Sequence, residues 1–156
     1  MVKLTLFFRY LFLSGYSSGI HYWEVIFSDV DTDSENPSYV GVCTSNQPAT
    51  GRIGGNRSNW GLCLSDGALY TWYRVIARGN IERFEKARVT VGLLLDMENC
   101  TLDFFVNTKH VLSHKCPEWK VKIVSICIDV KLHTIFPCAS FWKRQSDVTI
   151  NFDVNK

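Results

Sequence analysis

Short runs of apolar residues recur along the chain, with turn-forming residues between them. Several runs alternate apolar and polar positions, which is the period of a β-strand with one buried face. The pattern predicts strands at 21–27, 38–43, 60–64, 68–73, 87–96, 101–107, 120–128, 135–142 and 147–152. Because no segment sustains a 3.6-residue apolar period, the sequence predicts one all-β domain, a sandwich or a barrel.

Two turns between these strands have a specific chemistry. Asp66-Gly67 in SDGALY is a tight-turn pair between two strands. LLLDMENCTLDFF predicts a hairpin that turns around Asp96 to Cys100. Asp96 and Asn99 suit this turn, because their short side chains can bond nearby backbone amides.

The stretch GIHYWEV, residues 19–25, concentrates ring side chains and one carboxylate in a single strand. Alternation puts His21 and Trp23 on one face and Tyr22 and Glu24 on the other. Both faces are largely apolar, which is typical of a strand inside a two-sheet sandwich. We therefore expect Trp23 to be a buried packing anchor and Glu24 to be held by a buried hydrogen bond.

Composition and charge narrow the function. The chain has 156 residues, 46% of them hydrophobic, which is enough for a core without metals or disulfides. Seventeen basic and 15 acidic residues give a net charge of +2, so no nucleic acid or membrane partner is expected. The six cysteines form no CxxC pair, and we expect reduced, buried thiols at Cys43, Cys63, Cys100, Cys116, Cys127 and Cys138. Reduced thiols indicate a cytoplasmic protein, with the nucleus as a second compartment.

The first 19 residues resemble a secretory signal, with Lys3 before an apolar stretch and small residues after it. Arg9 interrupts the apolar stretch, however, and we interpret YLFLSGYSSG as a strand that leads into GIHYWEV. A secreted chain remains the alternative.

The sequence offers no convergent set of catalytic or metal-binding residues. His110 and His114 are four residues apart and would face one metal ion only on a helix, whereas their segment is typical of a strand and loop. GRIGGN at 51–56 lacks the Lys-Ser/Thr of a phosphate loop. We interpret 29–35 as a connecting loop and 74–88 as a solvated loop of mixed charge. No enzyme activity, cofactor or metal is expected.

The segments SSGIHYWEV, YVGVC, NWGLCLSDGALY, VGLLLDMENCTLDFFVN and FPCASFW with VTINF occur in this order. Together they resemble the SPRY (B30.2/SPRY) domain family over residues 12 to 153. The family's two signatures match WEVI at 23–26 and LDME at 95–98, while Cys100 stands where a Gly is usual. The resemblance implies a bent β-sandwich of two antiparallel sheets, concanavalin A-like, at 12–156, after an N-terminal extension at 1–11.

The resemblance also implies a function. SPRY domains recognise protein or peptide partners through loops at one end of the sandwich, and many select substrates for ubiquitin ligases or adaptors. The structural signature residues would be Trp23, Glu24, Trp60, Leu95 and Asp96. The expected partner-binding residues are Arg52, Arg57, Asn59, Trp72, Tyr73, Arg74, Trp142, Lys143 and Arg144. A core position for Trp72 stays open, because ALYTWY alternates. A secreted SPRY-type effector and a carbohydrate-binding, lectin-like sandwich are the alternative functions.

Overall fold

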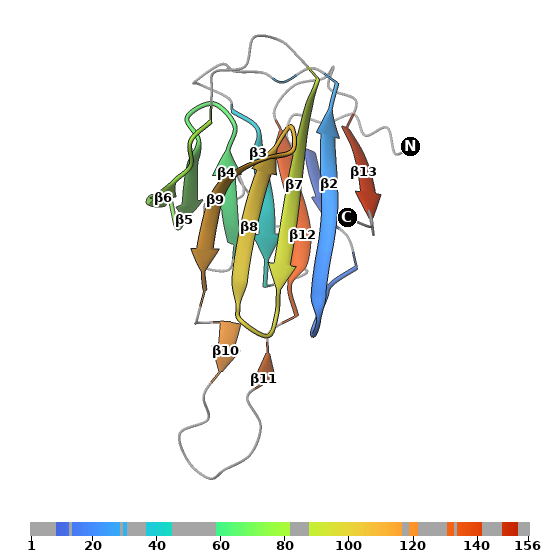
Figure 1. The fold of residues 1–156 in the computed structure, drawn as a ribbon, viewed down its shortest axis with the longest axis vertical. Coiled ribbons are helices and arrows are strands. Elements are labelled where there is room, and N and C mark those ends of the chain that lie inside the picture. The colour runs from blue at the N-terminus through green and yellow to red at the C-terminus, as the bar shows by residue number, and fades with distance from the viewer. Residues whose placement is uncertain are drawn as a thin grey trace.

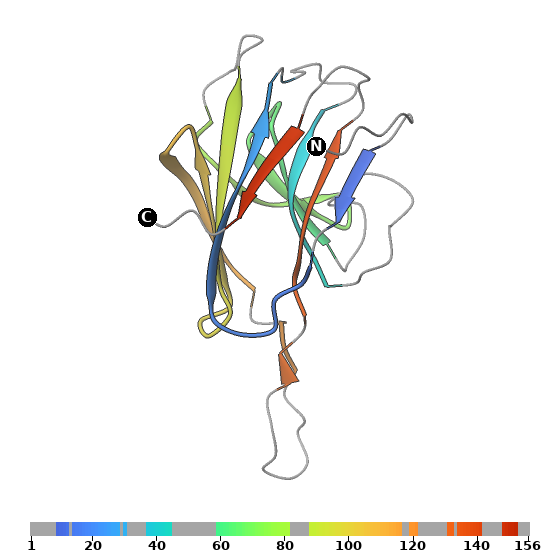
Figure 2. The same cartoon turned by 90° about the vertical axis from the view of Figure 1, so that its right-hand side faces the viewer.

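The computed structural model of the protein describes residues 9–12, 14–28, 30, 37–44, 59–81, 88–116, 119–121, 131–132, 134–141 and 148–152. These residues form two antiparallel sheets that face each other, with a short two-stranded ribbon below them (Figure 1). Figure 2 shows the sheets edge-on, on either side of the core. The expected all-β sandwich of two antiparallel sheets is confirmed.

Each sheet combines strands from both halves of the sequence. The six-stranded sheet has the order β1 (Arg9–Phe12), β12 (Phe136–Phe141), β3 (Tyr39–Cys43), β4 (Asn59–Cys63), β5 (Ala68–Thr71) and β6 (Arg74–Arg78). The five-stranded sheet has the order β13 (Val148–Phe152), β2 (Ile20–Phe27), β7 (Val89–Asp96), β8 (Thr101–Val106) and β9 (Lys109–Lys115). The ribbon pairs β10 (Lys120–Val121) with β11 (Lys131–Leu132).

The main core lies between the two sheets and follows the alternation of the strands. Along β2, Trp23, Val25 and Phe27 are buried, whereas the side chains between them are half-buried. From the opposite sheet, Trp60 meets Trp119 edge to face, with ring centroids 5.5 Å apart. Large aromatic rings are therefore part of the main core, where their burial removes much apolar area from water.

A second, smaller cluster is separate from the main core. It contains Tyr39, Cys43, Cys63 and Cys138, with the half-buried Tyr70 packed against them. Every residue of β3 and of β4 is buried, because these strands contribute to the main core on one face and to this cluster on the other. Continuous apolar runs such as YVGVC are typical of strands that are covered on both faces.

Strands occur at eight of the nine predicted places, and the structure differs from the pattern in the following respects. The strand predicted at 68–73 ends at Thr71. The stretch from Arg74, interpreted as a loop, begins with β6, and the histidine segment forms all of β9. Of 120–128, only Lys120–Val121 belongs to the described strands. β1 covers Arg9–Phe12, so among the described residues the strand expected in YLFLSGYSSG is confined to the start of that stretch.

The cysteines agree with the expected chemistry in the part of the chain that is described. Cys43, Cys63, Cys100, Cys116 and Cys138 are buried, free thiols, and Cys127 lies outside the described residues. Within those same residues, no helix is long and apolar enough to cross a membrane.

Both predicted turns have the expected bonds. Gly67 has a φ of 72°, and the Asp66 carboxylate accepts a hydrogen bond of 2.8 Å from the Ala68 amide. In the second turn, one carboxylate oxygen of Asp96 accepts bonds from the amides of Glu98 and Asn99, both 2.9 Å long. In each turn, a short acidic side chain thus accepts hydrogen bonds from backbone amides of the turn.

Cys100 ends the second turn in a conformation that favours glycine. Its φ is 53°, in the left-handed region, and its side chain is buried with 1% exposed. A left-handed non-glycine residue costs about 1–2 kcal/mol. The chain accepts this cost, and the buried Sγ, 3.6 Å from the Met97 carbonyl oxygen, fills space in the core.

This conflict predicts an inverted order of stability between two substitutions. Cys100→Ala removes the buried sulfur and keeps the left-handed strain, whereas Cys100→Gly removes both. We expect the glycine variant to be more stable than the alanine variant by about 1 kcal/mol, the reverse of the usual order within a strand or helix. Urea unfolding of the two variants measures the difference, and a more stable alanine variant would show that the turn carries no strain.

Candidate functional site

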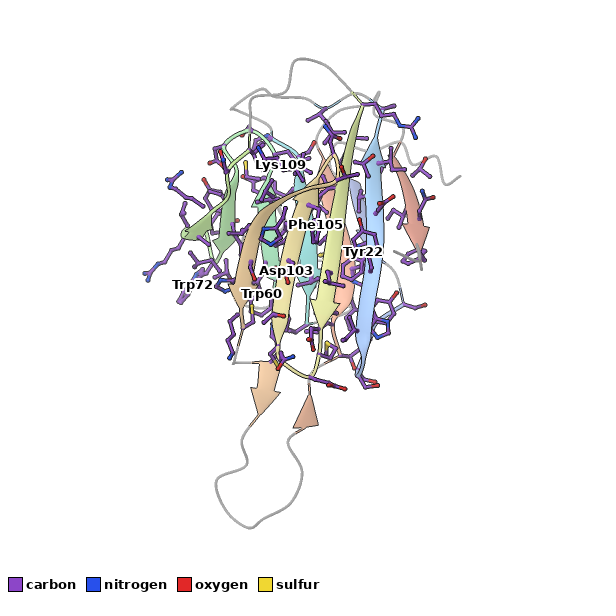
Figure 3. All side chains as sticks on the ribbon, in the orientation of Figure 1. Tyr22, Trp60, Trp72, Asp103, Phe105 and Lys109 are labelled. Atoms are coloured by element: carbon purple, nitrogen blue, oxygen red, sulfur yellow. The ribbon has the colours of Figure 1, made fainter. Side chains whose placement is uncertain are left out.

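The turn between β5 and β6 presents two large aromatic side chains to solvent. Thr71 pairs with Arg74, so Trp72 and Tyr73 are the only residues of a two-residue hairpin turn. Trp72 is 45% exposed and Tyr73 is 58% exposed. Figure 3 places Trp72 at the margin of the molecule, beside β5 and β6. The core position left open for Trp72 is therefore wrong, because the strand ends one residue before it.

The backbone of this turn is in an unfavourable conformation for its residues. Trp72 has a φ of 47° and Tyr73 a φ of 59°, so both central positions are left-handed. Positive φ at both positions defines a type I′ turn, for which Asn-Gly is the preferred pair. Two bulky residues here cost about 1–2 kcal/mol each relative to an unstrained backbone. A strained, exposed aromatic pair is unfavourable for folding, and residues in such conformations cluster at binding sites and other functional surfaces.

The residues next to the turn are also exposed, and they are basic or apolar. The Arg74 guanidinium carbon lies 5.6 Å from the centroid of the Trp72 ring, within cation–π range. Val75 and Ile76 are 40% and 37% exposed, and Arg78 is exposed at the end of the strand. β6 is the edge strand of its sheet. We call Trp72, Tyr73, Arg74, Val75 and Ile76 the hairpin patch.

The other expected binding residues do not join this patch among the described residues. Asn59 is 3% exposed and belongs to β4, so the expectation that it lies in a binding loop is wrong. Asn59 pairs with Cys43 of β3, which is buried as well. Five residues lie outside the described part of the chain: Arg52, Arg57, Trp142, Lys143 and Arg144.

The direction of β12 bears on the expectation that the partner-binding residues lie together at one end of the sandwich. Ser140, near the end of β12, pairs with Tyr39 at the start of β3. Asn59, at the start of β4, pairs with Cys43 at the other end of β3, which is the end that carries the β5–β6 turn. β12 therefore runs away from the hairpin patch.

The signature residues have positions that favour packing over recognition. Trp23, Trp60 and Leu95 are buried in the main core. The Asp96 carboxylate holds the β7–β8 turn. Glu24 accepts a hydrogen bond of 2.9 Å from the Tyr22 hydroxyl, but the pair is half-buried on the outer face of the sheet rather than inside the core as expected.

Sequence reasoning missed a polar and aromatic strip on the outer face of the five-stranded sheet (Figure 3). Tyr22 meets Phe105 edge to face at 6.2 Å, and Phe105 meets the His110 ring at 5.2 Å. His110 Nε2 lies 2.9 Å from an Asp103 carboxylate oxygen. The alternation of TLDFFV does place Asp103 and Phe105 on one face, but the link to β2 depends on which strands pair.

His110 and His114, considered above as a possible metal-binding pair, lie in separate surroundings. His110 pairs with Asp103, whereas His114 lies opposite Leu102, beyond a register shift in the β8–β9 ladder. In the part of the chain that the structure describes, no three His, Cys, Asp or Glu side chains gather into a metal site.

The comparison with known families decides the identity. The sequence model of the SPRY domain matches residues 20–154. The chain belongs to the SPRY domain family. Such domains are generally protein-interaction modules rather than enzymes. The family match begins at the first residue of β2 and extends past β13, so it includes the hairpin patch.

This SPRY domain is similar to part of a ubiquitin ligase. The E3 ubiquitin-protein ligase TRIM9 of Drosophila melanogaster is 27% identical over 93 residues, which are 60% of this chain and 12% of the ligase. The chain thus corresponds to only a small part of that ligase's length.

Similar solved structures show the same fold. They include the SPRY domain of human HERC1, with a TM-score of 0.63 and 18% identity, over 96% of this chain and 84% of that chain. A human SPRY domain gives 0.68 and 16% over 96% and 87%. The TRIM65 PSpry domain gives 0.61 and 18% over 91% and 70%.

Proposed function

We propose that this SPRY domain binds a protein partner through the hairpin patch and thereby selects a substrate for a ubiquitin ligase or adaptor. The observation that carries the proposal is the pair Trp72 and Tyr73, exposed and left-handed in a turn that folding alone would give to Asn-Gly. Strained residues persist at surfaces where recognition requires them. Trp, Tyr and Arg are also the residue types that dominate binding hot spots.

The chemistry of the patch indicates the kind of partner surface. Trp72 and Tyr73 offer flat rings with polar tips, which suit an apolar pocket whose rim accepts hydrogen bonds. Arg74 and Arg78 add positive charge on the same hairpin, and the strand between them contains no acidic residue. A complementary partner would therefore present an apolar pocket bordered by carboxylates.

The ligase context rests on the similarity to the TRIM9 ubiquitin ligase over 93 residues. A substrate-selecting module in such a protein acts in the cytoplasm or the nucleus, which agrees with the buried, free thiols. No catalytic residue is assigned to the chain, because its contribution would be binding.

The test exchanges the strained pair for the residues that the turn prefers. In the double variant Trp72→Asn/Tyr73→Gly, the hairpin keeps its backbone and loses both rings. We expect the free energy of unfolding to rise by about 1–2 kcal/mol, since Asn and Gly tolerate positive φ. We expect partner affinity to fall by about 30-fold or more, the loss of at least one hot-spot contact.

The measurement has two parts. Proximity labelling in cells with the wild type and the double variant identifies partners that depend on the patch, and titration calorimetry with each purified partner gives the affinity. Phe152→Ser is the matched control, since Phe152 is 41% exposed on the edge strand β13 of the other sheet. An unchanged partner set and affinity in the double variant, or an equal loss in the control, would contradict the proposal.

A further inference from the structure

Two thiols of the second cluster are almost in bonding contact. Cys43 ends β3 and Cys138 lies in the neighbouring strand β12. In the register of the two strands, Cys43 is opposite Phe136 and Cys138 is opposite Gly41, so the cysteines form a diagonal pair. Both point to the outer face of the sheet, where they share the second cluster. Their sulfur atoms are 2.6 Å apart.

We propose that Cys43 and Cys138 form a covalent modification site, at which oxidation by a peroxide joins β3 to β12 through a disulfide. A disulfide bond is about 2.0 Å long, so the two sulfur atoms need to approach by only roughly half an ångström. Many cysteine pairs in neighbouring strands cannot be bridged because their Cβ vectors diverge. Here the two side chains already point at each other.

The chemistry balances with hydrogen peroxide as the oxidant. The thiolate of one cysteine attacks a peroxide oxygen and the O–O bond breaks, which gives a sulfenic acid and, after protonation, one water. The second thiol then attacks the sulfenic sulfur, so that the S–S bond forms and the hydroxyl leaves as the second water. Two thiols lose two electrons and two protons, and one peroxide becomes two waters.

Burial makes this site selective for a small oxidant. Cys43 and Cys138 are 4% and 2% exposed. Burial raises the pKa of the Cys138 thiol well above its ordinary value, and the adjacent Cys43 adds to this effect. The Cys138 thiol is therefore mostly protonated at neutral pH, and the buried pair reacts slowly with bulky thiol reagents. Hydrogen peroxide can reach it, whereas a large disulfide such as oxidised glutathione is excluded until the sheet opens.

A third cysteine of the same cluster provides the internal control. Cys63 is 2% exposed, so burial alone does not distinguish it from the pair. Its Sγ lies 3.1 Å from the Ser65 hydroxyl oxygen. If proximity of the sulfur atoms governs the reaction, Cys63 remains a thiol under conditions that join Cys43 to Cys138.

The experiment treats the purified, reduced full chain with hydrogen peroxide and then alkylates the remaining thiols in denaturant. We expect the number of alkylated thiols to fall from six to four, which is six minus the two that join. Peptide mapping without reductant should identify a Cys43–Cys138 linkage. Cys63→Ser should give the same linkage, and Cys43→Ser should give none.

Three outcomes would overturn the proposal. They are six remaining thiols at a peroxide dose that links cysteines in the urea-unfolded chain, a linkage that uses Cys63, and sulfinic acid at either cysteine without a linkage. The wild-type map decides between them even if Cys43→Ser does not fold. Protein isolated with the linkage already formed would support the proposal, because it shows that the folded chain joins these two residues.

Discussion

Trp23→Ala is expected to lower the free energy of unfolding by about 3–5 kcal/mol, a large part of the roughly 5–15 kcal/mol that a domain of this kind has. Trp23 has no exposed surface and lies in β2 between Phe152 of β13 and Leu93 of β7. Removing the indole leaves a cavity in the main core between the two sheets, and the hydrogen-bonded strands around it can close it only in part. Urea unfolding followed by circular dichroism measures the loss.

Two matched substitutions separate packing from other roles of this tryptophan. Trp72→Ala removes an indole that is 45% exposed and should change stability by less than about 0.5 kcal/mol. Trp23→Phe should cost less than Trp23→Ala, since a ring remains and the indole N–H has no acceptor among the described residues. If the Trp23→Ala domain keeps the wild-type free energy of unfolding but no longer binds its partner, Trp23 is a ligand contact instead.

Gly41→Ala is expected to cost about 3 kcal/mol or more, at or above the upper end of the range of ~1–3 kcal/mol for ordinary overpacking. Gly41 lies opposite Gly61 of β4 and Cys138 of β12, in the middle of the six-stranded sheet. A Cβ atom at Gly41 would overlap the backbone carbonyl oxygen of Trp60. Since backbone atoms of paired strands cannot rotate away, β3 and β4 would have to separate.

Gly92→Ala is the control for this argument. It makes the same change in the middle of β7, but there the new Cβ would meet the Tyr22 hydroxyl, at the end of a side chain that can rotate. We expect the free energy of unfolding to fall by about 1–2 kcal/mol, which includes the loss of the 2.9 Å hydrogen bond from the Tyr22 hydroxyl to Glu24. Thermal unfolding of both variants compares them, and equal losses would show that the backbone overlap at Gly41 is relieved at little cost.

The interior of this fold could be predicted from the sequence, because buried strands have strong patterns. The continuous apolar run of β3 and the alternation in β2 and β8 agree with their burial. The turns at Asp66-Gly67 and Asp96 were also predictable, since Asp and Gly act there through local backbone chemistry.

Two of the strands that the pattern did not predict, β6 and β9, are edges of their sheets. Edge strands are partly solvated and contain charged residues that prevent pairing with other chains. Arg74 and Arg78 in β6, and Lys109 and Lys115 in β9, therefore gave these segments the composition of loops. Burial of apolar residues could not reveal them, because only their inward positions contribute to the core.

The candidate site was predictable only in part. Residue type alone identified Trp72, Tyr73 and Arg74, which the structure places in an exposed turn and at the start of β6. Residue type also selected Asn59, which is buried because β4 begins there. The turn itself was not predictable, since a type I′ turn without Asn or Gly has no local signature.

The order of the strands also has a consequence for the synthesis of the protein. β1 pairs with β12 and β2 pairs with β13, so each sheet joins an early strand to one of the last strands of the chain. Contacts between such distant segments close large loops and slow folding. As the chain leaves the ribosome, one edge of β2 and one edge of β3 have no partner until residues 136–152 emerge. Both edges are therefore open to pairing with other nascent chains until β12 and β13 have been made.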